Sequence, residues 1–300
     1  MGIFYLTLSR LAGIGKMIAM KKCGNIASGA ENGLKINLVR SLGCSLVSLI
    51  ICAIAGFGEV SGLGMLFSIL SGVANAALLF GWILCAERAS LCAVEIFCMI
   101  GGVILPMVAS LFIFEGESVG IAKWLASILL IVAAYLFSKK GGKERSGLSP
   151  AATALLLFTC VANAGCVLTQ KLFSYYECGT ATDFSLLTFL FCSLALGVAY
   201  LILLLLKRGR TSEEKGKTKA KKYIIVYILV AIVMLYSAQL LSTMSAELLE
   251  ATLYFPLSYA IGMPLTFLTD TIVFKERIRL SSVIGLSLVI LAIVFIGINF

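Results

Sequence analysis

The chain has 300 residues, of which 60% are hydrophobic and 13% charged, with 24 Lys and Arg against 15 Asp and Glu. A soluble domain is about half apolar and about a quarter charged, so this composition excludes a protein whose whole surface faces water. The net charge of +9 does not indicate nucleic-acid binding, because the basic residues stand in short runs between apolar stretches.

Apolar stretches long enough to cross a bilayer as helices, about 20 residues each, follow one another along the chain. We predict an all-α membrane protein with ten transmembrane helices, over residues 3–20, 38–56, 62–85, 90–113, 121–138, 149–169, 184–206, 223–245, 251–273 and 280–299. The first stretch contains Arg10 and Lys16, which are costly in lipid. It therefore either lines a wet cavity or lies partly outside the hydrocarbon.

The two halves of the chain resemble each other. A helix that contains a Pro, ends on an aromatic residue and is followed by Glu occurs at 105–117 and again at 263–276, and residues 37–46 resemble 185–194 in the same order. We therefore predict two five-helix repeats, 1–146 and 147–300. Because five is odd, the second repeat enters the membrane from the opposite side, an inverted arrangement that is common in secondary transporters.

Basic residues indicate the orientation. We assign 20 of the 24 Lys and Arg residues to the odd-numbered connections, counting Arg40, the third residue of the predicted span 38–56, with the connection before it, and the run 207–222 is the longest such connection. The positive-inside rule places these connections in the cytoplasm and both termini outside. We expect a multi-pass protein of the plasma (inner) membrane with a basic cytoplasmic loop at 207–222.

The stretch Val94–Pro106, followed by Leu111–Glu117, resembles the fourth helix and following Glu of the drug/metabolite transporter superfamily, particularly its EamA-type bacterial members. Residues Tyr259–Glu276 repeat the pattern more loosely in the second half. The resemblance implies two inverted five-helix bundles, a central cavity and alternating access. It also implies that helices one to four and six to nine surround the cavity, while helices five and ten lie to one side.

Two prolines, Pro106 and Pro264, occupy matching places in the fourth and ninth predicted helices. Proline removes a backbone donor and loosens the preceding turn, which a membrane helix tolerates where the freed carbonyl faces protein or water. The pair is either a hinge for alternating access or a fixed kink that helps packing.

Three ionisable residues fall within or beside predicted spans. Glu95 can exchange a proton during transport or bind a cationic group, unless it lies at the wet mouth of its helix. Lys16 can attract an anionic substrate into the cavity. Lys171 is more readily explained by a side chain that reaches the membrane interface.

Further polar and aromatic residues lie inside predicted spans and are candidates for contact with substrate. The amides belong in contact with protein or cavity, where they bind substrate or bridge helices, and the aromatic residues form either an aromatic wall or an interfacial belt. These candidates are Asn75, Trp82, Asn163, Gln170, Gln239, Tyr254 and Tyr259.

We predict a secondary transporter of a small organic metabolite or drug. The alternatives are a flippase or carrier of sugar-linked or nucleotide-sugar-like substrates and, from another class, a membrane scaffold or sensor. The chain has no His, no Cys-x-x-Cys pair and no Walker motif, so we predict neither a metal site, nor a cofactor, nor ATP as the driving force, nor an enzyme. The small residues Ala122, Ala126, Ser281 and Gly285 favour helix packing within a monomer or a homodimer face.

Overall fold

The computed structural model describes residues 1–26, 30–88, 94, 97–114, 120–138, 150–207, 221–273 and 280–297. Over these ranges the chain forms helices joined by short turns, with no β-strand. In chain order the helical segments are α1 (Gly2–Ile26), α2 (Ala30–Ala55), α3 (Gly62–Arg88), the π-helical turn η1 (Ile100–Ile104), α5 (Leu105–Ile113), α6 (Ile121–Ser138), α7 (Pro150–Tyr175), α8 (Ala181–Lys207), α9 (Lys221–Leu248), α10 (Ala251–Ile272) and α11 (Leu280–Gly297).

Each predicted span overlaps one of these helical segments, and the span predicted over 121–138 coincides with α6, whereas α1, α2 and α7 extend six to eight residues beyond the predicted bounds. Seven helices are long and apolar enough to cross a membrane: α1, α2, α3, α7, α8, α9 and α10. Three further apolar segments are shorter, at Phe97–Ile113, Ile121–Ala133 and Val283–Ile296. The predicted α-helical membrane fold is therefore confirmed, while the count of ten crossing helices stays a prediction.

The outer faces of the helices suit lipid rather than water. On α8, Leu194, Leu201 and Leu205 are exposed at a spacing that places them on one side of the helix. Similar exposed apolar residues occur on α2, α3 and α9. Apolar surface of this extent is not found on a soluble monomer, and it is what the hydrocarbon of a bilayer covers.

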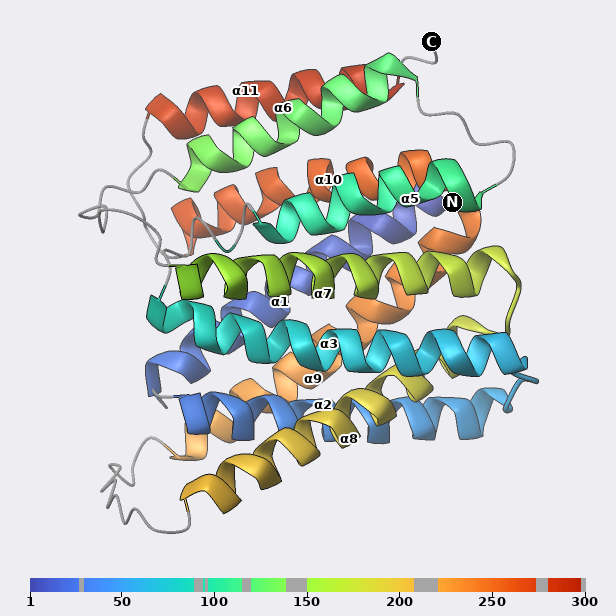
Figure 1. Cartoon of the computed structure of the whole chain (residues 1–300), viewed down its shortest axis with the longest axis vertical. Helices are drawn as coiled ribbons and strands as arrows, with labels where there is room; N and C mark the ends of the chain where they lie inside the picture. The colour runs from blue at the N-terminus through green and yellow to red at the C-terminus, as the bar shows by residue number, and fades with distance from the viewer. Residues whose placement is uncertain are drawn as a thin grey trace.

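The helices form a ring. Going around it, α1 packs against α9, α9 against α2, α2 against α8, α8 against α3, α3 against α7, α7 against η1, the η1–α5 segment against α10, and α10 against α1. Figure 1 looks onto one side of this ring, with α5, α7, α3 and α8 in front of α10, α1, α9 and α2. Helices that are distant in sequence therefore share one interior.

The remaining two helices, α6 and α11, pack against each other and lie at one end of the molecule, beside α10 (Figure 1). Their contact uses small residues, since Ala126 and Ala292 are fully buried and Gly285 is buried as well. Small side chains allow two membrane helices to approach closely. Ala126 and Gly285, two of the four small residues singled out in the sequence, are thus buried in this part of the chain.

Candidate functional site

Three basic residues lie deep within the helices that form the ring. Arg10 and Lys16 belong to α1 and Arg40 to α2. At a rise of 1.5 Å per residue they lie about 12, 15 and 15 Å from the nearer end of their helices. The prediction that Arg40 belongs to a loop is wrong: α2 begins ten residues earlier, at Ala30, and the Arg40 side chain is only 4% exposed.

The three positive charges converge although α9 separates α1 from α2 in the ring. Gly15 of α1 lies against Met234 of α9, and Gly43 of α2 lies against Ile232 of the same helix, so Lys16 and Arg40 stand at a similar level of α9. The Arg10 guanidinium carbon lies 5.8 Å from the centre of the Tyr259 ring, and the Arg10 side chain passes beside Gly262 of α10. A cationic site thus connects α1, α2 and α10.

No carboxylate pairs with these three cations in the part of the chain that the structure describes. The ion pair formed there joins Lys35 to Glu31 at 2.7 Å, near the start of α2. The buried Nε atoms of Arg10 and Arg40 make no hydrogen bond. A charged Arg or Lys at the centre of a membrane helix costs about 3 kcal/mol, so stability does not account for a cluster of three without counter-charges.

Beside Arg10, a polar contact joins three segments of the ring. The amide nitrogen of Asn163 on α7 donates to the Tyr259 hydroxyl at 2.8 Å and to the Cys98 carbonyl at 2.6 Å. Gly102 of η1 lies directly against the Tyr259 hydroxyl, where a Cβ atom would overlap it. The structure therefore brings together Asn163 and Tyr259, which the sequence singled out separately.

A second buried network connects α7, α9 and α10. The Gln170 amide donates to Thr243 Oγ1 at 2.8 Å and to the Gln239 carbonyl at 3.4 Å, and it accepts from the Tyr254 hydroxyl at 3.1 Å. Ser242 Oγ lies 2.6 Å from Tyr254 Oη. Tyr254 is 1% exposed, so it does not belong to an interfacial belt, and that reading of the sequence is wrong.

Lys171, four residues before the end of α7, is buried against the end of a neighbouring helix. Its side chain is 5% exposed, and its ammonium donates to the carbonyls of Ala246 and Leu249 at 2.8 and 2.6 Å. These carbonyls stand at the end of α9, where the helix has no further amides to bind them. Lys171 is thus a capping residue, unlike the three clustered cations.

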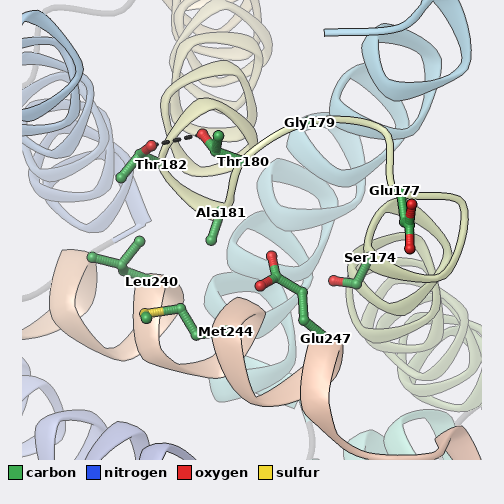
Figure 2. A pocket seen from close by; sticks show the side chains of 9 residues that line it. All are labelled: Ser174, Glu177, Gly179, Thr180, Ala181, Thr182, Leu240, Met244 and Glu247. Carbon is green, nitrogen blue, oxygen red and sulfur yellow. Dashed lines mark hydrogen bonds between the residues drawn. The ribbon is translucent and has the colours of Figure 1, made fainter. Parts of the chain in front are cut away.

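A pocket of about 620 Å³ opens between the α7–α8 turn and the end of α9. Figure 2 shows the Glu247 carboxylate of α9 near Ala181, with Ser174 of α7 at its side. Ser9 Oγ of α1 donates to the Ala238 carbonyl of α9, so the neighbouring Arg10 lies at about the level of Ala238. Glu247 of the pocket lies about 13 Å further along α9. The pocket is lined by Ser174, Glu177, Gly179, Thr180, Ala181, Thr182, Leu240, Met244 and Glu247.

Three candidates from the sequence are not part of these networks. Asn75 donates to the Ser71 carbonyl of its own helix at 2.9 Å. Trp82 is 37% exposed and makes no ring contact with Tyr254 or Tyr259. Glu95 lies outside the described residues, so its predicted function stays a prediction.

The two matching prolines differ in their surroundings. Pro106 is the second residue of α5, which follows the π-helical turn η1, and the Leu105 amide at this junction donates to the Ile100 carbonyl. Pro264 lies within the continuous helix α10, together with Pro256. A π-helical turn in a membrane helix is a local irregularity of the kind found at functional positions, and no pattern in the sequence predicts it.

No protein-family model matches the sequence, and no curated protein does. Among solved structures, 28 chains match. One of them, described only as a crystal structure of a protein, is similar with a TM-score of 0.72 and 11% sequence identity, over 99% of this chain and 96% of that chain. At this identity the similarity shows the fold alone.

The fold and its apolar exterior define the class: the chain is a multi-pass α-helical membrane protein. Its particular feature is an interior in which Arg10, Lys16 and Arg40 lie close together without a described counter-charge.

Proposed function

We propose that this protein is a secondary transporter, which moves a small organic solute across the plasma membrane by alternating access. The observation that carries the proposal is the set of three charged residues well inside the helices of the ring, of which Arg40 is buried and Arg10 and Lys16 are half-buried. Ionisable residues inside a membrane protein are costly, and they are typically retained where a solute or an ion passes.

The pattern of helix contacts supports an internal two-fold symmetry, as the resemblance to the drug/metabolite transporter superfamily implies. Pairing the halves matches α1 with α7, α2 with α8, α3 with α9, η1–α5 with α10 and α6 with α11. Under this exchange the α1–α9 contact becomes α7–α3, the α9–α2 contact becomes α3–α8, and the α2–α8 and α6–α11 contacts map onto themselves. Every other contact of the ring likewise becomes another contact of the ring when the two halves are exchanged.

Such symmetry favours a transporter over a scaffold or sensor. Two inverted repeats around one site provide two related states, in which the site opens to opposite sides of the membrane. A scaffold needs neither the symmetry nor buried charges without partners. The η1 turn beside Pro106 is the place where the described backbone departs from α-helical geometry within the ring, and a rearrangement there would move α5 relative to α7.

The pocket in Figure 2 supports an entrance at the end of the ring formed by the α7–α8 turn. The loop charges place this end outside the cell, opposite the basic loop at 207–222. A volume of about 620 Å³ is in the range that accepts a small organic molecule. Its lining combines two carboxylates with apolar Leu240 and Met244.

Reconstitution tests the proposal. Purified protein in liposomes should take up at least one labelled solute from a panel of sugars, amino acids, amines, organic acids, phosphate esters and nucleosides. Uptake should saturate, exceed that of protein-free liposomes, and accelerate when the same unlabelled solute is enclosed. If no solute in such a panel crosses, a scaffold or sensor function replaces the proposal.

A further inference from the structure

Although the chain is basic, most of its cations lie in connections, and only a few face the interior. Among these, Lys171 binds the end of α9, whereas Arg10, Lys16 and Arg40 have no described carboxylate partner. We infer that this cluster binds the anionic group of the transported solute, a phosphate or a carboxylate. The inference rests on the proposed function, because an anion bound halfway across a membrane is a substrate only if the protein carries it.

Each of the three side chains supplies what an oxyanion requires. Arg40 presents a planar guanidinium whose paired N–H groups match two oxygens of a carboxylate or phosphate. Lys16 adds a compact positive charge with three donors. Arg10 packs against the face of the Tyr259 ring, 5.8 Å from its centre, which holds a guanidinium in place without neutralising it.

Tyr259 adds a fourth donor. Its oxygen accepts the Asn163 amide at 2.8 Å, and no described group accepts the proton of its own hydroxyl. Asn163 is anchored in turn by the Cys98 carbonyl. The hydroxyl of the ring that Arg10 overlies is thus positioned by a hydrogen bond that does not use its own proton.

The cluster does not follow the internal symmetry. With 37–46 aligned to 185–194, Arg40 corresponds to Thr188, which is uncharged, and Arg10, Lys16 and Arg40 all precede residue 147, where the second repeat begins. All three cations therefore come from the first half of the chain. The anionic group binds to the side of the site formed by α1 and α2, and the uncharged part of the solute extends toward α7 and α8.

A purely stabilising role and a lipid-binding role both fit the cluster less well. Cations that stabilise the fold pair with carboxylates or cap helices, as Lys35 and Lys171 do. A phospholipid headgroup would have to reach Arg40, which is 4% exposed and enclosed by the ring.

The test measures binding by the thermal stability of the purified protein in an uncharged detergent at pH 7. The probes are glycerol phosphate, succinate and inorganic phosphate, with glycerol as the neutral counterpart, choline as a cation, and phosphatidylglycerol as an anionic lipid. We expect at least one soluble anion to raise Tm in a saturable way, while glycerol and choline do not. Arg40→Gln should weaken this binding by about tenfold or more, because it removes one of the three positive charges that face the anion.

Matched variants separate binding from folding. Lys35→Gln removes one positive charge from the exposed start of the same helix and should leave anion binding unchanged. Arg40→Lys keeps the charge and should bind more tightly than Arg40→Gln. Three results would each overturn the inference. The first is equal stabilisation by glycerol and glycerol phosphate, and the second is an equal loss of anion binding in Lys35→Gln and Arg40→Gln. The third is stabilisation by phosphatidylglycerol alone.

The same preparations in liposomes distinguish failure of this inference from failure of the proposed function. Saturable transport of a neutral or cationic solute, unaffected by Arg40→Gln, would retain the transporter and overturn the anion site. Anion binding that depends on Arg40, without transport of any solute, would support the anion-binding cluster. It would contradict the proposal that the protein is a transporter, and with it the proposal that this anion is its substrate.

Discussion

Lys16 of α1 and Arg40 of α2 stand at a similar level of α9, because Gly15 lies against Met234 of that helix and Gly43 against Ile232. Two like charges held together in a low-dielectric interior repel each other. A chain selected for stability alone would replace one of them. Their proximity therefore favours an anion that binds between them during the protein's activity.

The first prediction concerns the stability of the ligand-free protein. Arg40→Leu removes a buried charge without a described counter-charge, so we expect it to leave the free energy of unfolding unchanged or to raise it by about 1–3 kcal/mol. Lys35→Leu, which breaks an exposed pair, should change it by less than about 1 kcal/mol. Unfolding in mixed detergent micelles measures both, and a loss of stability in Arg40→Leu well beyond that of Lys35→Leu would contradict the assignment.

Lys171 should behave in the opposite way. Its ammonium donates to the carbonyls of Ala246 and Leu249, so Lys171→Met leaves buried acceptors without a donor. We expect a loss of about 2 kcal/mol, the magnitude of a hydrogen bond to a charged group. If Lys171→Met were as stable as the unaltered protein, the contrast between a capping cation and a binding cluster would be lost.

A third prediction concerns the close packing of η1. A methyl group on Gly101 would overlap the Cys160 carbonyl of α7, so Gly101→Ala should destabilise the protein by about 1–3 kcal/mol. The matched control is Gly13→Ala in α1, where a Cβ atom would meet no neighbour within 4 Å. Since alanine favours a helix more than glycine does, this control should be neutral or slightly stabilising. Equal effects of the two substitutions on Tm would contradict the described contact.

Glu95 provides a prediction from the sequence. If this carboxylate exchanges protons during transport, Glu95→Gln should remove the pH dependence of solute uptake while solute binding persists. Uptake into liposomes under acidic, neutral and alkaline conditions, measured with and without an imposed proton gradient, checks this. An unchanged pH profile would eliminate Glu95 as the coupling residue.

The helices were predictable because lipid imposes a simple rule. A segment of about 20 apolar residues must satisfy its backbone within itself, so the predicted 121–138 coincides with α6, and 251–273 differs from α10 by one residue. The π-helical turn η1 was not predictable, because it depends on the packing of Gly101 and Gly102 against α7 and α10.

The candidate site was predictable only in part. Lys16, Asn163 and Tyr259 are anomalous within apolar runs, which identifies them individually, but only the fold brings Asn163 and Tyr259 into contact. Arg40 was missed because it lies near other basic residues at the start of its span. Glu177 and Glu247 of the pocket were missed because acidic residues at helix ends are ordinary in sequence and meet only through the contact of α7 with α9.

The most direct measurement is the exchange of a labelled organic anion across liposomes that contain the purified protein. We expect uptake to be saturable, to be accelerated by the unlabelled anion inside, and to fall about tenfold or more in Arg40→Gln, but not in Lys35→Gln. The absence of transport for every anionic, neutral and cationic solute, in protein shown to be folded by its melting transition, would contradict the assignment of this membrane protein as a transporter.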